Sequence, residues 1–189
     1  MDGFNNYITQ FDYSWLTDFM VQNGTLMHYR RGEMFCFAGQ PCKTLGFIRK
    51  GAFIYSAQNI EAEKHMVGYA FENTFVCDYA AFRLKEPSNV DIAALMNSDV
   101  YLVTYDQLNR FITESIETRD YFLRISEVLY SEIYQRYVTI YTRTAEERFT
   151  EILHRCPEIF SLTTAKDLAS YLNISPETLS RIRKKQREE

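Results

Sequence analysis

Glycine, proline and tryptophan are scarce in this chain of 189 residues, which contains 7 Gly, 4 Pro and 1 Trp. This composition excludes collagen-like, low-complexity and linker-dominated chains, because such chains need far more glycine or proline. Tyrosine and phenylalanine are abundant instead, with 14 of each. The length suits one or two domains of about 100–150 residues, so the chain is long enough to bury a sizeable core.

Excess positive charge and long apolar runs are both missing. The 21 Lys and Arg residues face 25 Asp and Glu residues, which leaves a net charge of −4. Taken alone, this total argues against a nucleic-acid partner, because phosphate binding needs local positive charge. No apolar stretch approaches the ~20 residues of a membrane span, and Met1–Asn6 lacks the features of a signal peptide. We therefore expect a cytoplasmic protein without a membrane partner.

The four cysteines, Cys36, Cys42, Cys77 and Cys156, are scattered and form no CxxC pair. Free thiols in a reducing compartment are typical of this pattern. Cys36 and Cys42 are close enough in sequence to hold a redox centre, but nothing nearby completes a ligand set. A cupin-type metal site needs His-x-His with a further Glu and His, and no catalytic motif of the GxSxG, P-loop or HExxH type occurs. We expect no metal, no cofactor, no catalytic residues and no enzymatic activity.

Short apolar and aromatic groups dominate the segment from Leu26 to about Tyr105, where they alternate with turn residues. This pattern is typical of an all-β sandwich or roll. Residues 1–25 have helical spacing before it, and Asn23-Gly24 ends that helix. Five of the seven glycines lie in the β segment, and we attribute them to tight corners that need a positive φ.

Helical spacing returns at about Asp106, and no Gly or Pro interrupts residues 106–156. Apolar side chains recur every three or four residues and predict a helix from about Ile116 to Tyr141, ~40 Å long. Its apolar stripe exceeds the surface that a small β-roll covers, so we predict a dimerisation helix; packing on its own domain is the alternative. The predicted dimer residues are Phe122, Ile125, Leu129, Ile133 and Tyr137.

The C-terminal segment has the spacing of a helix-turn-helix. Thr164-x-x-Asp167 resembles a capping box and opens the first helix. Ser175-Pro176-Glu177 opens the second, with an N-cap serine, a first-turn proline and a carboxylate at the positive end of the helix dipole. Between them, Asn173 stands where the turn needs a left-handed backbone, and Ala169 is the small residue where the helices touch. The expected interhelical apolar positions are Leu168, Leu172, Ile174, Leu179 and Ile182.

The exposed face of the second helix is predicted to enter the major groove of DNA. Residues 181–187 contain five cations, for which a solvated basic tail is the alternative interpretation. Arg181 is the candidate for bidentate contact with guanine, and Glu177 for contact with a cytosine amino group. The other cations are expected to meet phosphates. The predicted DNA-binding residues are Ser175, Pro176, Glu177, Thr178, Ser180, Arg181, Arg183, Lys184 and Lys185.

Nearly the whole chain resembles the Crp/Fnr transcription regulators, the family of the cyclic-AMP receptor protein. The resemblance is carried by the turn glycines Gly32, Gly39 and Gly51, by residues 71–79 and 86–89, and above all by residues 167–185. It implies an α+β fold with a cyclic-nucleotide-binding-like β-roll (a jelly roll), a dimerisation helix and a helix-turn-helix domain. We expect these parts at residues 1–113, 114–142 and 143–189.

The DNA-binding motif of this family agrees with the positions chosen above, since the residues that match Glu177 and Arg181 read bases in the family. The residue that matches Pro176 is often Arg there, so one base contact is expected to be missing. The sequence ends five residues after Lys184, so no β-wing is expected.

The sensor part departs from the cyclic-AMP binders. Those proteins carry Gly-Glu where this chain has Cys77-Asp78, and an Arg whose position here falls at Ser88 or Asn89. Burying an anionic phosphate without a cation is costly, so we predict that cyclic AMP is not bound in the usual way. The candidate effector-binding residues are Phe71, Asp78, Ser88, Asn89, Tyr130 and Tyr134.

Together these patterns predict a homodimeric transcription regulator that binds a palindromic operator. Its expected partners are double-stranded DNA and a second copy of itself, with RNA polymerase and an unidentified small-molecule effector as further candidates. An effector sensor that acts through protein contacts without DNA is the alternative, and it leaves the C-terminal motif unexplained. The net charge of −4 then conceals a strongly basic segment at residues 181–187.

Overall fold

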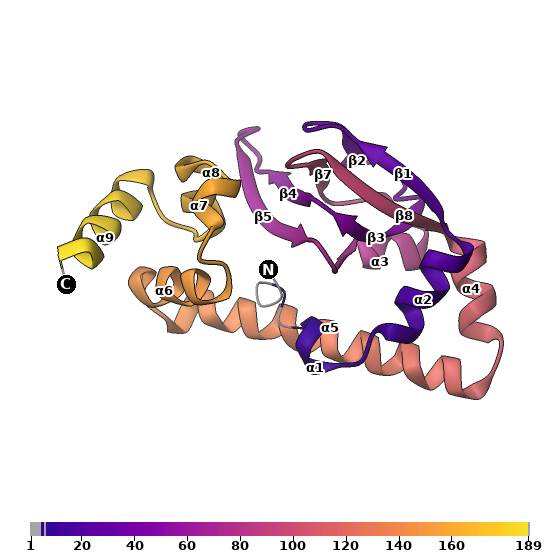
Figure 1. The fold of residues 1–189 in the computed structure, drawn as a ribbon. Coiled ribbons are helices and arrows are strands. Elements are labelled where there is room, and N and C mark those ends of the chain that lie inside the picture. Colours follow the sequence, from indigo (N-terminus) through magenta and orange to yellow (C-terminus); the bar gives the residue numbers. More distant parts are fainter. Residues whose placement is uncertain (1–4, 6, 189) are drawn as a thin grey trace.

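The computed structural model describes residues 5 and 7–188, which form a β-roll, a long helix beside it and a group of C-terminal helices (Figure 1). The roll consists of two antiparallel four-stranded sheets, with strand orders β1-β8-β3-β6 and β2-β7-β4-β5. The strands are β1 (Thr25–Tyr29), β2 (Met34–Cys36), β3 (Thr44–Lys50), β4 (Ala52–Gln58), β5 (Lys64–Phe71), β6 (Phe75–Val76), β7 (Asp91–Ala94) and β8 (Ser98–Thr104). The predicted α+β fold with an N-terminal roll is confirmed.

Helices flank the roll on one side and at one end (Figure 1). The long helix α5 runs beside the roll, with α4 at its first end and α6 to α9 gathered at its last. Within the described residues, no helix is both long and apolar enough to span a membrane. The helices are α1 (Tyr7–Gln10), α2 (Ser14–Asn23), α3 (Tyr79–Leu84), α4 (Tyr105–Thr113), α5 (Ile116–Thr142), α6 (Ala145–Arg155), α7 (Ile159–Leu162), α8 (Ala165–Tyr171) and α9 (Pro176–Glu188).

Capping residues divide the helical stretch after the roll into separate helices. The side chains of Thr104, Ser115 and Thr144 each accept a hydrogen bond from the backbone N–H three residues ahead. The side chain of that later residue in turn accepts a hydrogen bond from the backbone N–H of the capping residue. Such reciprocal caps satisfy N–H groups that a helix start leaves unpaired. The predicted helix from about Ile116 to Tyr141 is confirmed as α5.

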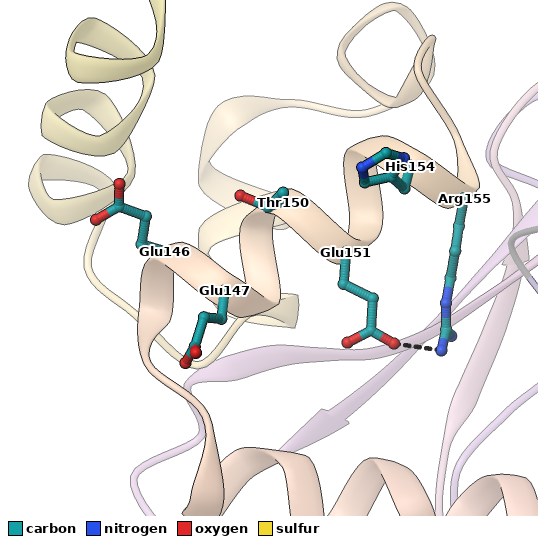
Figure 2. Close-up of a pocket in the computed structure, with 6 residues that line it drawn as sticks. All are labelled: Glu146, Glu147, Thr150, Glu151, His154 and Arg155. Atoms are coloured by element: carbon teal, nitrogen blue, oxygen red, sulfur yellow. Dashed lines mark hydrogen bonds and ion pairs between the residues drawn. The ribbon is translucent and has the colours of Figure 1, made fainter. Parts of the chain in front are cut away.

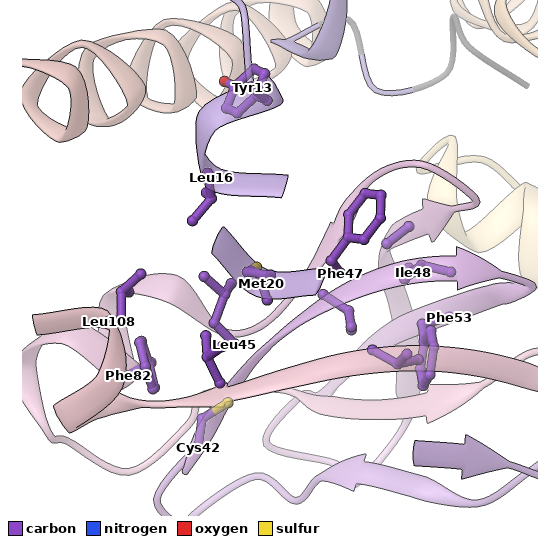
Figure 3. Close-up of a cluster of buried hydrophobic side chains, with 14 of the residues drawn as sticks. Tyr13, Leu16, Met20, Cys42, Leu45, Phe47, Ile48, Phe53, Phe82 and Leu108 are labelled. Atoms are coloured by element: carbon purple, nitrogen blue, oxygen red, sulfur yellow. The ribbon is translucent and has the colours of Figure 1, made fainter. Parts of the chain in front are cut away.

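The first core lies between the two sheets and extends to α2, α4 and α5 (Figure 3). Met20, Ile48, Phe53 and Leu108 are fully buried in it. The ring of Phe53 meets those of Tyr29 and Phe35 edge-to-face, with centroids 5.5 and 5.9 Å away. Aromatic pairs in this geometry are stabilising beyond the area they bury. Many of the aromatic side chains of the sequence lie in this core or pack against it.

The second core joins the C-terminal helices to the roll. Phe149, Ile159, Leu168 and Leu179 form its centre and are almost completely buried. Strands β4 and β5 contribute three further buried side chains, which are Ala52, Tyr69 and Phe71. The helices of residues 145–188 therefore complete their core with side chains of the roll.

Glycines of the roll serve two different purposes. Gly32, Gly39 and Gly51 have positive φ, as predicted for tight corners. Gly46 and Gly68 do not, so the corner explanation is wrong for them. At Gly46 the reason is close packing, because an added Cβ would lie 2.6 Å from Cγ1 of Val100.

Gly51→Ala is expected to destabilise the protein more than Gly32→Ala. Both residues have positive φ, but a Cβ on Gly51 would lie 2.7 Å from Cα of Ser98, whereas a Cβ on Gly32 would meet nothing within 4 Å. Left-handed strain costs Gly32→Ala about 1–2 kcal/mol, and the clash adds about 1–3 kcal/mol for Gly51→Ala. Urea unfolding of both variants measures the difference, and equal midpoints would contradict the assigned role of Gly51.

Candidate nucleic-acid interface and sensor pocket

Helices α8 and α9 form a helix-turn-helix with the predicted internal geometry. Asn173 has a φ of 55°, the left-handed conformation that the turn requires. Ala169 is completely buried between the helices, as expected for the close contact. The apolar positions Leu168, Leu172, Leu179 and Ile182 are buried, and Ile174 is partly buried.

Both helices of this motif begin at capped residues. Oγ1 of Thr164 accepts from the N–H of Asp167 at 3.1 Å and donates to its Oδ2 at 2.8 Å. Oγ of Ser175 accepts from the N–H of Thr178 at 3.1 Å. Hydrogen bonds from its own backbone N–H and from Ser175 lower the pKa of Glu177. Glu177 is therefore a carboxylate at neutral pH, able to accept hydrogen bonds only.

Most of the predicted DNA-binding residues are exposed, but two of the cations among them also contact neighbouring helices. The guanidinium of Arg183 lies over the ring of Phe160, 3.9 Å from its centroid. Nζ of Lys185 lies 2.8 Å from Oε1 of Glu146. These two cations hold α9 against α7 and α6, and phosphate contact stays a prediction for both. The exposed residues are Ser175, Pro176, Glu177, Ser180, Arg181, Lys184 and Lys185, and Thr178 and Arg183 are partly buried.

Helix α8 is attached directly to β5, an edge strand of the roll. Oγ of Ser170 accepts a hydrogen bond from the backbone N–H of Met66 at 2.9 Å. The hydroxyls of Tyr69 and Thr163 are 3.1 Å apart. The ring of Tyr69 also meets that of Tyr171 edge-to-face at 5.1 Å. Sequence reasoning missed these residues, because no local pattern relates a strand to a helix about 100 residues later.

Two arginines connect the long helix to the same junction. Arg136 on α5 lies over the ring of Tyr171 at 4.0 Å and donates to the backbone carbonyl of Val67 at 2.5 Å. Arg148 on α6 donates to the carbonyl of Leu172 at 3.2 and 3.1 Å, through Nε and NH2. NH1 of Arg148 donates to the carbonyls of Ile140 and Arg143 at 3.4 and 2.6 Å. The ends of α5 and α8 therefore share one guanidinium.

Asp78, Ser88 and Asn89, three of the candidate effector residues, come together in the sensor part. Oδ1 of Asp78 accepts from the N–H of Ala81 at 3.2 Å and so caps α3. Its Oδ2 accepts from Oγ of Ser88 at 3.0 Å and from the N–H of Asn89 at 3.1 Å. One carboxylate therefore already occupies three donors of this segment.

The other predicted effector residues lie elsewhere. Phe71 is completely buried in the second core beside Tyr69, with ring centroids 6.0 Å apart. Tyr130 and Tyr134 are 69% and 51% exposed on α5, and their rings stack on each other. In the described part of the chain, neither Tyr130 nor Tyr134 makes a hydrogen bond or ring contact with Asp78. Phe71, Tyr130 and Tyr134 therefore lie apart from the Asp78 network, and an effector-binding role for them stays a prediction.

This architecture is similar to a known domain family and to several solved structures. Residues 26–115 match the family model of the cyclic nucleotide-binding domain. No curated protein matches the chain. Among solved structures, FixK2 from Bradyrhizobium japonicum superposes with a TM-score of 0.71 at 15% identity, over 87% of this chain and 85% of that one.

Two further structures match over similar lengths. The c-di-GMP responsive global regulator CLP from Xanthomonas campestris has a TM-score of 0.68 at 16% identity, over 94% of this chain and 92% of its own. A protein from Eubacterium rectale assigned to the Crp/Fnr family of transcriptional regulators has a TM-score of 0.69 at 14% identity, over 97% and 88%. The chain has the Crp/Fnr fold. The fold that the family resemblance implied is thus confirmed.

The long helix of this Crp/Fnr fold turns a different face outward from the one predicted. Phe122 and Ile125 are only 5% and 3% exposed, because they pack in the first core of their own subunit. Leu129 is partly buried against the same core. Phe122 and Ile125 are therefore not available to a partner, whereas Ile133 and Tyr137 are 69% and 57% exposed. The alternative of packing on its own domain holds for the first half of α5.

A second apolar stripe follows the outer face of α5. Its members are separated by seven, four, three and four residues, the spacing of a coiled-coil seam. The rings of Tyr137 and Tyr141 contact each other with centroids 5.0 Å apart. We call these residues the tyrosine seam; they are Leu123, Tyr130, Tyr134, Tyr137 and Tyr141, all exposed.

A shallow hollow on the outer face of α6 groups several charged side chains (Figure 2). Each of its carboxylates already has a partner. Glu146 binds Lys185, Glu147 completes the cap at Thr144, and Glu151 pairs with both Arg143 and Arg155. These side chains hold α6 against α5 and α9, which is a structural role in the Crp/Fnr fold.

Proposed function

We propose that this protein is a DNA-binding transcription regulator that reads a palindromic operator as a homodimer. The observation that carries the proposal is the outer face of α9. Glu177 and Arg181 stand one turn apart on it, both exposed, and Ser180 and Lys184 flank them. Arg181 donates to no group in the described part of the chain. An exposed guanidinium beside an exposed carboxylate supplies the donor and acceptor that base edges require.

The position of α9 supports major-groove binding. Leu179 and Ile182 face the protein core, so the opposite face points outward. The N-terminal turn of a recognition helix is the part that reaches base edges, and here that turn begins at Ser175 and Pro176. Lys184, one turn beyond Arg181, is the proposed phosphate contact on the same face.

The tyrosine seam supports dimerisation through α5. We assign this seam to a second copy of the chain, because a palindromic site requires two-fold symmetry and a heptad stripe is suited to pairing with itself. This assignment replaces Phe122 and Ile125 as dimer residues, because both are buried in their own subunit. Two α9 helices would then read half-sites about one DNA turn, ~34 Å, apart. RNA polymerase and a small-molecule effector stay proposed partners without an assigned surface.

We propose a regulator in the cytoplasm rather than an enzyme. The sensor part is expected not to bind cyclic AMP in the usual way. The carboxylate of Asp78 accepts the hydrogen bonds of Ser88 and Asn89, which stand where the family's phosphate-binding Arg is expected. A cyclic phosphate brought there would face a carboxylate, and like charges at close range repel.

Arg181→Ala is expected to weaken binding to an operator selected from random DNA by about 1–3 kcal/mol and to relax base preference at one position of each half-site. Fluorescence anisotropy at fixed salt measures the affinity. Arg124→Ala is the matched control, because it removes an equally charged, exposed side chain from α5, where it pairs with Glu127. Unchanged affinity and base preference in Arg181→Ala would contradict the placement of α9.

Tyr134→Asp is expected to convert the dimer to a monomer at micromolar concentration, because pairing of the seam would bury an unpaired carboxylate. Sedimentation velocity measures the state. Ile60→Asp makes a comparable apolar-to-acid change at a fully exposed residue outside the seam and is expected to stay dimeric. A monomeric wild type, or a Tyr134→Asp variant that stays dimeric, would show that the seam is not the interface.

Titration calorimetry with cyclic AMP is expected to give no saturable heat in the micromolar range, because Asp78 already engages the donors of the segment. Binding at micromolar or lower Kd would overturn this expectation while leaving the DNA-binding proposal intact.

A further inference from the structure

Three of the four cysteines, far apart in sequence, gather inside the β-roll. Cys36 ends β2, Cys42 precedes β3, and Cys77 follows β6. Sγ of Cys42 and Sγ of Cys77 are 3.6 Å apart, in contact across 35 positions of sequence. Cys42 is 6% exposed, and Cys77 is partly exposed. All four cysteines are free. The spacing of the cysteines in the sequence hid this pair, because the fold alone brings the two loops together.

Hydrogen-bond donors converge on the sulfur of Cys42. As a thiol, Cys42 donates to the carbonyl of Thr44 at 3.7 Å. As a thiolate, it accepts hydrogen bonds from the thiol of Cys77 and the backbone N–H of Asp78. The bond from Cys77 is the largest effect, and together these donors lower the pKa of Cys42 to about 7 despite its burial. Burial raises the pKa of Cys77 well above its usual value. Of the two, Cys42 therefore supplies the thiolate and Cys77 the thiol that faces it.

We propose that Cys42 and Cys77 are a redox pair that a hydroperoxide converts into an intramolecular disulfide. The thiolate of Cys42 attacks one peroxide oxygen, an S–O bond forms and the O–O bond breaks. The leaving oxygen takes up a proton and departs as water or an alcohol. The sulfur of Cys77 then attacks the sulfenic sulfur of Cys42, an S–S bond forms, and the S–O oxygen leaves as water with the Cys77 proton. Two thiols are oxidised by two electrons and one hydroperoxide is reduced.

The geometry favours this pair over the other cysteines. The two sulfurs need to approach from 3.6 Å to about 2.05 Å. Cys36 also adjoins Cys42, but its own thiol is directed to the carbonyl of Phe37 at 3.8 Å, and burial raises its pKa to about 11. Cys156 is completely buried in the second core. Metal binding is not favoured, because no group of three or more His, Cys, Asp or Glu within the described residues is arranged to hold a metal ion.

The disulfide would form next to the polar network of the sensor part. Cys77 directly precedes Asp78, and its backbone N–H donates to the hydroxyl of Tyr55 at 3.2 Å. Asp78 in turn caps α3 and holds Ser88. A new bond at Cys77 is therefore placed to move the start of α3. This site needs neither DNA nor a second copy, so the inference stands independently of the proposed function.

The test is oxidation of the full-length reduced protein with a small excess of hydrogen peroxide. Mass spectrometry of the intact chain and peptide mapping are expected to show loss of two hydrogen atoms and a Cys42–Cys77 cross-link that dithiothreitol reverses. In Cys77→Ser, dimedone is expected to trap a sulfenic acid on Cys42. In Cys42→Ser, no disulfide to Cys77 is expected. Cys156→Ser is the control and is expected to behave as the wild type.

Mapping on the wild type keeps the test decisive even if a variant does not fold, and circular dichroism of each variant identifies such a case. Four free thiols after peroxide treatment, or a cross-link that joins Cys36 instead of Cys77, would overturn the proposal.

Discussion

The arrangement of the helix-turn-helix depends on one guanidinium, that of Arg148. It donates to backbone carbonyls at the end of α5 and at the end of α8. Helix C-termini carry unpaired carbonyls and partial negative charge, so a cation placed between two of them satisfies both. Because Leu172 directly precedes the turn at Asn173, this bond also sets where α9 starts. The direction of the long helix and the position of the candidate recognition helix are thereby coupled.

The two hydrophobic cores extend this coupling through the molecule. The roll completes the second core with Ala52, Tyr69 and Phe71, while α5 completes the first with Phe122 and Ile125. The bond from Met66 to Ser170 adds a point of attachment at the edge of the sheet. An edge strand has unpaired backbone groups, and here Ser170 of the helix-turn-helix accepts a hydrogen bond from one of them. A change in the position of β5 would therefore act directly on α8 through the Met66–Ser170 hydrogen bond, and on α9 through the shared second core.

Charged and ionisable side chains have distinct roles in the C-terminal helices and in the roll. The cations of residues 181–187 have two different environments. Arg183 lies over the ring of Phe160 and Lys185 pairs with Glu146, whereas Arg181 lies on the outer face of α9. In the roll, a carboxylate and a group of thiols occupy the region where the family resemblance implied a nucleotide pocket. Asp78 accepts donors there, and Cys42 lies against Cys77. The chemistry of this region is that of thiols and a carboxylate.

The helices and the turn of the helix-turn-helix could be predicted from the sequence, because the residues that define them are close together in the chain. Caps, the left-handed Asn173 and the buried Ala169 all act within a few residues of one another, so their spacing alone specifies the motif. The β-roll was also predictable, since alternating apolar groups and turns report strand pairing in general terms. On the long helix the sequence determined that apolar stripes exist but not which stripe faces inward. Packing against α2 and α4 decided that, and it buried Phe122 and Ile125 while leaving the tyrosine seam outside. Likewise, the contact between Cys42 and Cys77 and the attachment of Ser170 to Met66 join residues that are 35 and 104 positions apart. Only the tertiary structure decides such contacts, because they arise from how sheets and helices pack and not from any repeat along the chain.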